Sequence, residues 1–172
     1  MEKVLGPASL QRTGDFGFPV KLLAAGDGSS EGRTLARMGR GGWFRVFFGR
    51  GRRIELPNGT NWRLAATETG PYIVPIVTSE SGKLAIAVPH GEKSYVISGR
   101  DFAYNFYPTS RRGLRKSSWV LREHDVEHAF FESRSAFASH EVPLAAMLLC
   151  FTLIKYGVPG ESQLGIPQFR WA

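Results

Sequence analysis

The sequence predicts a mainly β protein, namely a closed antiparallel barrel of about twelve strands around one buried hydrophobic helix near residues 143–156. Two observations lead to this fold class. Short strand-like segments, separated by turn residues, recur about every 8–12 residues, as in all-β sandwiches and barrels. A single long apolar run, Val142–Gly157, stands near the C-terminus. The 172 residues, of which 42% are hydrophobic, can form one sizeable core, so we expect a single domain over residues 1–172.

The first expected strands have the weakest patterns. Pro19–Ala24 and Arg33–Met38 are short and only partly apolar. Trp43–Phe48 is aromatic and contains a β-branched valine, a composition enriched in strands. Arg52–Leu56 follows a glycine-rich stretch and is the next expected strand.

A hairpin is expected around Pro57-Asn58-Gly59. Asn-Gly tolerates the positive φ that a tight hairpin turn requires. The following segment, Asn61–Ala66, alternates in the manner of a half-buried strand, with Trp62 and Leu64 on one face and Arg63 on the other.

The strand pattern continues through the second half of the chain. Tyr72–Thr78 contains Pro75, which cannot donate to a sheet ladder and therefore indicates an edge or a bulge. Lys83–Val88 places Leu84, Ile86 and Val88 on one face. Turns are expected at Ser81-Gly82, His90-Gly91 and Gly99. The remaining expected strands are Ser94–Ser98, Asp101–Tyr107, Ser118–Glu123, Val126–Glu132 and one or two uncertain segments near 135–140.

The apolar run is expected to be a helix from about Pro143 to Tyr156. Proline suits a first helical turn, and Gly157 followed by Pro159 is a stop signal. Such a helix is about 21 Å long, whereas a bilayer core is about 30 Å thick, so the helix is too short to span a membrane. It is apolar on every side, and an all-apolar helix must be buried on every side. A sheet that closes around the helix achieves this and also removes exposed strand edges.

The cysteine content and the N-terminus indicate the compartment. The single cysteine, Cys150, lies inside the apolar run and is expected to be a small buried hydrophobic residue, so the chain has no disulfide framework. The first residues contain no apolar segment of signal-peptide length. We therefore expect a cytoplasmic protein, with peripheral attachment to the inner membrane surface as a further option.

The charge predicts an anionic partner. The formal net charge is +7, with two clusters of basic residues. The segment Thr109–Trp119 is expected to be a basic loop in which Arg111, Arg112, Arg115 and Lys116 bind phosphate oxygens and Trp119 enters a lipid interface. Near an anionic membrane each cation contributes about 1 kcal/mol. A solvated hairpin loop is the alternative.

The second cluster lies in residues 37–53, where arginines alternate with aromatic residues. Arg50, Arg52 and Arg53 are its candidate ligand-binding residues. Arginine with aromatic side chains can also bind nucleic acid through phosphate contacts and base stacking, so a nucleic-acid-binding module is the alternative function. A core strand with an exposed arginine face explains the same pattern without any ligand, and an acidic protein partner is also compatible with the charge.

The segment His124-Asp125-Val126-Glu127-His128 raises a metal site as a third hypothesis. On a helix its two histidines would share a face, and His140 could supply a third ligand. The neighbouring residues favour strands instead, so that a polar hairpin with a partly buried His128 is the simpler interpretation. We expect no catalytic residue, metal or cofactor, because no nucleophile elbow or zincin motif is present.

The order of elements resembles the tubby C-terminal-like superfamily, which includes tubby proteins, phospholipid scramblases and plant LURP-one-related proteins. The resemblance rests on the strand–turn units from Arg52 to Val88, and above all on VEHAFFES (126–133) followed by VPLAAMLLCFTLIKYG (142–157). It implies a barrel of about twelve strands around a central helix and a non-enzymatic role in binding phospholipid headgroups through basic side chains. The chain lacks the acidic calcium loop and the cysteine cluster of scramblases, so the resemblance does not imply scramblase activity.

Overall fold

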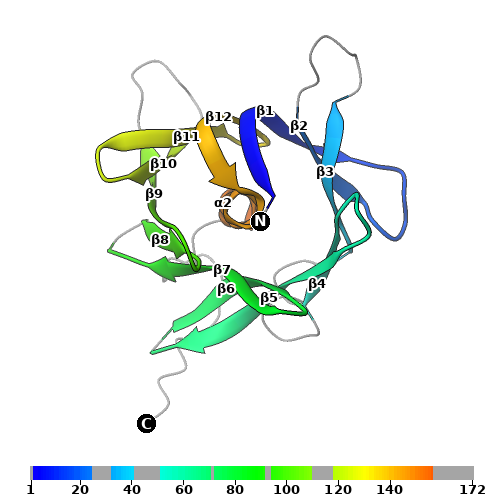
Figure 1. The fold of residues 1–172 in the computed structure, drawn as a ribbon, viewed down its shortest axis with the longest axis horizontal. Coiled ribbons are helices and arrows are strands. Elements are labelled where there is room, and N and C mark those ends of the chain that lie inside the picture. Colours follow the sequence, from blue (N-terminus) through cyan, green and yellow to red (C-terminus); the bar gives the residue numbers. More distant parts are fainter. Residues whose placement is uncertain are drawn as a thin grey trace.

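The computed structural model describes residues 2–24, 32–40, 51–70, 72–91, 94–109 and 118–156. It confirms the predicted fold class: within these described residues, twelve antiparallel strands form a closed barrel around the helix α2 (Figure 1). Each strand pairs with its neighbours in sequence, and β1 closes the barrel against β12. The elements are β1 (Lys3–Arg12), β2 (Val20–Ala24), β3 (Arg33–Met38), β4 (Arg52–Glu55), β5 (Asn61–Thr69), β6 (Tyr72–Ser79), β7 (Gly82–Pro89), β8 (Tyr95–Ser98), β9 (Ala103–Thr109), β10 (Ser118–Glu123), β11 (Val126–Glu132), β12 (Ser135–Pro143) and α2 (Leu144–Tyr156).

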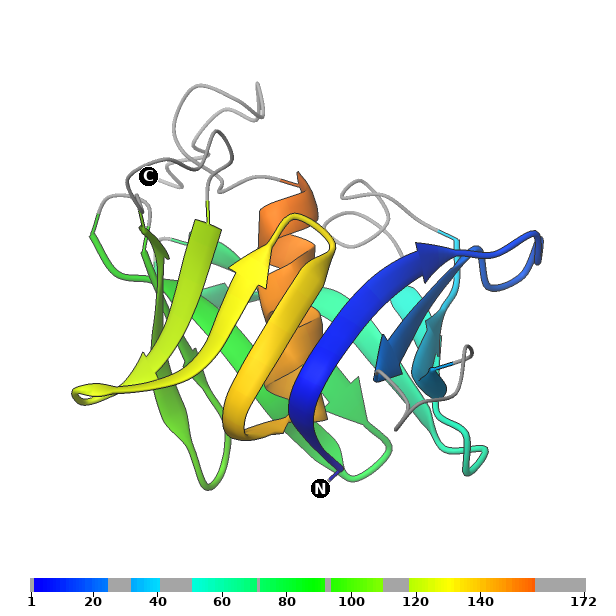
Figure 2. The ribbon, with the colours of Figure 1, turned by 90° about the horizontal axis from the view of Figure 1, so that it is seen from above.

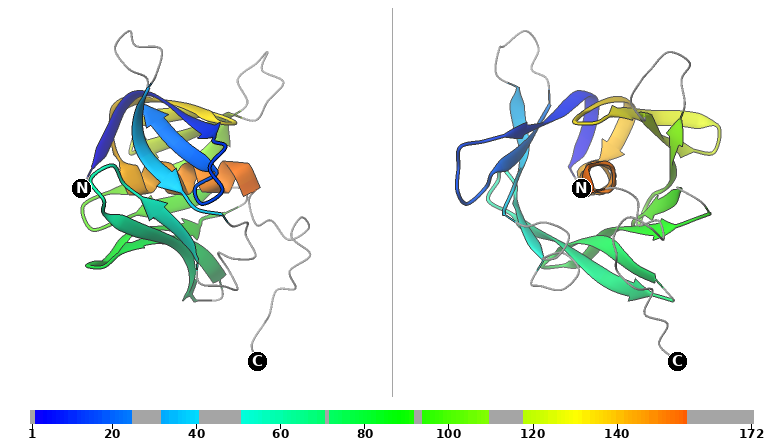
Figure 3. Two further views of the ribbon diagram at one scale, coloured as in Figure 1. Left: turned by 90° about the vertical axis from the view of Figure 1, so that its right-hand side faces the viewer. Right: turned by 180° about the vertical axis from the view of Figure 1, so that it is seen from behind.

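Consecutive strands run in opposite directions, so the odd-numbered strands all end at one end of the barrel. The helix starts directly after β12 and runs back through the barrel toward that end (Figure 2). We call this end of the barrel the helix-exit end. The views in Figure 3 show the strands wrapping around α2.

The sequence pattern missed β1. Gly6 and Pro7 interrupt it, and they occur where the pairing with β12 shifts between Val4 and Gly6. Gly6 has a φ of 80°, a conformation that suits a bulge and that residues with a Cβ rarely adopt. β1 is nevertheless essential to the fold, because it pairs with both β2 and β12 and so closes the barrel.

The predicted hairpin and the proline in β6 take the expected forms. The Gly59 amide donates to the Leu56 carbonyl oxygen at 2.9 Å in the turn between β4 and β5. Pro75 pairs with Ala66 of β5, whereas the pairing of β6 with β7 begins only at Ile76. At Pro75, β6 is therefore not paired with β7. The N–H that proline lacks is not needed there for a hydrogen bond of the sheet.

The helix is buried on all sides, as predicted. Every residue from Leu144 to Leu153 is at most 4% exposed. The helix begins one residue later than expected, and the Leu144 amide donates to the Glu2 carbonyl oxygen at 2.8 Å. Its polar side chain, Thr152, donates to the Leu148 carbonyl oxygen at 2.6 Å. Cys150 is a buried free thiol, and burial raises its pKa.

β7 presents its small residues to the interior. Ala85 and Ala87 are fully buried and pair with the buried Val77 and Ile97, whereas the face shared by Ile86 and Val88 points outward. The helix lies against β7, so alanine methyl groups fit between the strand and the helix. Among the described residues, no helix is long and apolar enough to cross a membrane.

Candidate functional site

Most of the predicted basic ligands fall outside the described residues. These are Arg50, Arg111, Arg112, Arg115 and Lys116. The described strands that flank them show where the clusters attach: β3 ends and β4 begins at the helix-exit end, and so do β9 and β10. Both clusters are therefore flanked by strand ends at the same end of the barrel.

The structure separates Arg52 from Arg53, which were expected to act together. Arg52 is 3% exposed and its Nε donates to the Gly39 carbonyl oxygen inside the barrel. The neighbouring Arg53 faces outward, with a side chain that is 61% exposed. Strand alternation explains the difference, because successive side chains point to opposite faces. Of the two, Arg53 can reach a partner in solution.

Arg53 belongs to a basic outer surface on β2–β5, which we call the basic face and define as Lys21, Arg37, Arg53 and Arg63. Lys21 lies opposite Arg37, and Arg37 lies opposite Glu55. Arg53 lies opposite Arg63 across the β4–β5 hairpin. Glu55 is between the cations, 4.0 Å from Arg37 and 3.9 Å from Arg53. Two carboxylates, Glu55 and Asp15 of the neighbouring β1–β2 turn, therefore act on a surface with four cations.

The direct Arg53–Arg63 pairing is the notable feature of the basic face, since like charges opposite each other destabilise a sheet. Arg53 is held in place by its surroundings: its Nε donates to Asn61 Oδ1 at 2.8 Å, and its guanidinium lies 5.6 Å from the Phe18 ring centroid. A bound anion would offset the repulsion. A hollow of about 290 Å³ adjoins this surface, and its lining includes Arg37 and Glu55.

An exposed phenylalanine stands beside the basic face. Phe16, in the connection between β1 and β2 at the helix-exit end, is 79% exposed, and the Arg40 guanidinium lies 4.8 Å from its ring centroid. Asp15 orders this turn by accepting hydrogen bonds from the Gly17 and Phe18 amides at 2.7 and 3.2 Å. The same hydrogen bonds lower the pKa of the Asp15 carboxyl.

Sequence reasoning missed this arrangement, although a signal was present. In a hairpin centred on the Pro57-Asn58-Gly59 turn, Arg53 and Arg63 are nearly equidistant from the turn and have the same orientation, so their pairing could have been anticipated. Lys21 and Phe16 gave no such signal, because β2 had a weak pattern and β1 was not recognised.

The expectation that Trp119 enters a lipid interface is wrong. Trp119 is 7% exposed and faces the barrel interior, where its ring stacks on Phe106 with centroids 4.9 Å apart. In β10, strand alternation directs Trp119 inward with Leu121, and both are buried. The residue is part of the core.

The metal-site hypothesis for residues 124–128 also receives no support. His124 and Asp125 form the turn between β10 and β11, so His124 and His128 do not share a helix face. In the described ranges, no group of three or more His, Cys, Asp or Glu side chains is placed to hold a metal ion. The simpler interpretation, a polar hairpin with a partly buried His128, is confirmed.

His128 lies in a cluster at the opposite end of the barrel from the helix exit. Its ring is 5.1 Å from Tyr104 and 5.0 Å from His140 between centroids, and its Nε2 is 3.4 Å from Glu123 Oε2. Nδ1 is buried with no hydrogen-bond partner in the described part of the chain. Burial lowers the pKa of His128, Glu123 opposes this shift, and His140 reinforces it.

We expect His128 to make the protein less stable in mild acid. Its pKa is lower in the folded than in the unfolded state, so the unfolded state binds the proton more readily. The stabilising contribution is complete above the unfolded pKa of about 6.5 and is lost as pH falls through it toward the folded value. His128→Gln should reduce the loss of unfolding free energy between about pH 7.5 and about pH 5.5 in urea titrations.

His90→Gln is the matched control for this measurement, because His90 is exposed. It should follow the wild-type pH dependence. An equal loss of stability in His128→Gln and wild type would contradict the role of His128.

The chain was compared with protein-family models, with curated proteins and with solved structures, and none of the three comparisons finds a match.

Proposed function

We propose that this protein is a non-enzymatic, tubby-like binding protein that attaches to anionic phospholipid headgroups at a membrane surface. The basic face supplies the phosphate contacts, and the sequence cluster Arg111, Arg112, Arg115 and Lys116 adds further cations. The placement is cytoplasmic, at the inner membrane surface.

The pairing of Arg53 with Arg63 is the observation that carries the proposal. The register places the residues Arg53 and Arg63 directly opposite each other, so two like charges are brought together, and Glu55 can offset only part of their repulsion. A phosphate group placed between them would accept charge-assisted hydrogen bonds from both. Because Asn61 and Phe18 already hold Arg53, little side-chain entropy is lost when a headgroup binds.

Phe16 favours a membrane over a soluble anion as the partner. A single exposed aromatic residue beside cations can enter the headgroup region while the cations bind lipid phosphates. The barrel around a central apolar helix is also the layout that the resemblance to the tubby-like superfamily implies. It supports the same class of function.

The test is co-sedimentation with liposomes. We expect binding to vesicles that contain phosphatidylserine or a phosphoinositide and no binding to neutral phosphatidylcholine vesicles. Arg53→Glu/Arg63→Glu should weaken binding by at least about 2 kcal/mol, roughly thirty-fold, because two cations are lost and two repulsive charges are added. Phe16→Ser should weaken it less. The quadruple change of Arg111, Arg112, Arg115 and Lys116 to alanine removes four cations and, at about 1 kcal/mol each, should also weaken binding by at least about 2 kcal/mol.

The charge-matched control is Arg100→Glu/Arg134→Glu, which alters two exposed arginines outside β2–β5 by the same total charge. Equal losses in the two double variants would mean that net charge alone drives binding, and would refute a site on the basic face. Absence of binding to any anionic vesicle would refute the membrane role and leave nucleic acid or an acidic protein as the partner.

Nucleic acid remains the alternative partner for the arginines of residues 37–53, because Arg40 stacks on Phe16 in the way that cations and aromatic residues combine in single-strand binding sites. Competition with single-stranded DNA separates the two functions. A nucleic-acid site would show a steep decrease of affinity with salt and no preference for vesicles.

A further inference from the structure

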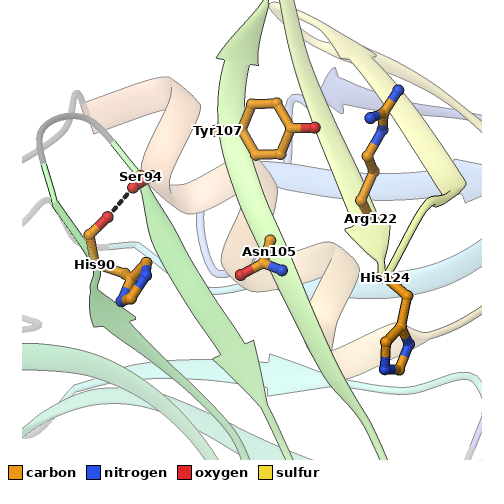
Figure 4. A pocket seen from close by; sticks show the side chains of 6 residues that line it. All are labelled: His90, Ser94, Asn105, Tyr107, Arg122 and His124. Carbon is orange, nitrogen blue, oxygen red and sulfur yellow. Dashed lines mark hydrogen bonds between the residues drawn. The ribbon is translucent and has the colours of Figure 1, made fainter.

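A polar pocket lies on the outer surface over β8–β10, on different strands from the basic face. Its volume is about 310 Å³. Figure 4 shows the six lining side chains, which come from the β7–β8 connection, β9, β10 and the β10–β11 turn: His90, Ser94, Asn105, Tyr107, Arg122 and His124. The strand pairing brings them together, since Asn105 lies opposite Arg122.

The lining residues favour an anion. All six carry hydrogen-bonding groups, and the lining contains a guanidinium, two imidazoles, an amide and two hydroxyls but no carboxylate. Glu127 lies opposite Arg122 in the β10–β11 pairing but does not line the pocket. The pocket therefore presents an excess of donors.

Arg122 provides the strongest indication of a ligand. Its Nε is buried and has no hydrogen-bond acceptor among the described residues. A buried donor without a partner is costly, and native proteins leave few of them. In Figure 4 the Tyr107 hydroxyl is directed toward the Arg122 side chain, and Asn105 lies between the two histidines.

We infer that this pocket binds a small phosphomonoester through Arg122, with Tyr107 and Asn105 as further hydrogen-bond partners. Phosphate oxygens match the planar donors of a guanidinium group. A pocket of about 310 Å³ is at the small end of ligand sites, so it suits a phosphate group with a small substituent. Ser94 contributes less, because its hydroxyl donates to the His90 carbonyl oxygen.

Titration with inorganic phosphate and with glycerol 3-phosphate, followed by NMR in a chloride buffer, tests the inference. We expect saturable shifts of the His90, Asn105 and His124 resonances with either ligand. Arg122→Gln should weaken binding at least ten-fold, and Tyr107→Phe, which removes only a hydroxyl group, should weaken it about three-fold. Arg134→Gln, at an exposed arginine of the β11–β12 turn outside both the pocket and the basic face, is the matched control and should bind phosphate as wild type does.

Absence of saturable shifts, or equal affinity in wild type and in a folded Arg122→Gln or Tyr107→Phe variant, would overturn the inference. Vesicle binding by Arg122→Gln identifies the source of the phosphate. Unchanged vesicle binding indicates a soluble phosphomonoester, whereas reduced binding assigns the pocket to a lipid headgroup. The vesicle test of the basic face is independent of the phosphate test of this pocket, because Arg53→Glu/Arg63→Glu leaves the pocket intact.

Discussion

Leu148→Asp is expected to abolish folding. Leu148 is 1% exposed at the middle of α2, which is enclosed by the barrel. Loss of the leucine side chain alone costs about 2–5 kcal/mol, and a buried carboxylate without a partner costs several more. Because folded domains are stable by only about 5–15 kcal/mol, the variant should be recovered as unfolded or insoluble protein. Circular dichroism and size-exclusion chromatography of the expressed chain will show this.

Two variants act as controls for this result. Leu148→Met conserves volume and should cost less than about 1.5 kcal/mol. Leu5→Asp introduces the same charge at a β1 residue that is 62% exposed, and should leave a folded protein. A soluble Leu148→Asp protein with a cooperative melt like that of wild type would contradict a helix enclosed by the barrel.

The helix could be predicted because its sequence leaves few alternatives. Residues Leu144–Ile154 contain no charge and one polar side chain, and Thr152 satisfies its own hydroxyl by donating to the preceding turn. Such a segment must be buried on every side, and strands were the other elements available to cover it. The strong hairpins, such as that at Pro57-Asn58-Gly59, were predictable for a similarly local reason, since turn chemistry acts over a few residues.

Features that depend on distant pairing were not predictable in this way. β1 has an irregular pattern, yet it closes the barrel because β12 offers it an edge. The inward face of β7 carries Ala85 and Ala87, because the approach of α2 decides which side chains fit there. Local hydrophobicity alone would place the larger apolar residues of β7, and not its alanines, on the inward face.

The candidate functional residues divide in the same way, into those that local sequence predicts and those that depend on pairing between distant segments. The sequence identified the basic segments, and strand alternation then separated Arg52 from Arg53. The cluster of His128 with Tyr104 and the pocket around Arg122 combine residues from separate strands. The register of β8 to β12 brings them together, and no short motif in the sequence encodes it.

Phe131→Ala is expected to cause the second largest loss, about 3–5 kcal/mol of unfolding free energy. Phe131 is fully buried in β11, and its ring meets Phe106 and Phe151 edge-to-face with centroids 5.5 and 5.3 Å apart. Truncation removes both contacts and leaves a cavity between the barrel wall and the helix. Urea unfolding followed by tryptophan fluorescence measures the loss, because Trp119 stacks on Phe106 within the same group.

Phe137→Ala is the matched control, since Phe137 lies on the adjacent strand β12 but is 54% exposed. It should change stability by no more than about 0.5 kcal/mol, as surface substitutions usually do. Similar losses at the two positions would mean that Phe131 is not enclosed.

A double-mutant cycle connects this loss to the helix itself. Phe131 belongs to the barrel wall and Phe151 to α2, so their coupling reports on contact between the two. With Phe131→Leu, Phe151→Leu and the double variant, we expect a coupling energy of about 0.5–1.5 kcal/mol, as for other edge-to-face aromatic pairs. A coupling near zero would mean that the helix does not pack on β11. The barrel strands would then have to be stable without the helix. Their inner surface is apolar and needs the helix to cover it, so such a result would contradict the fold.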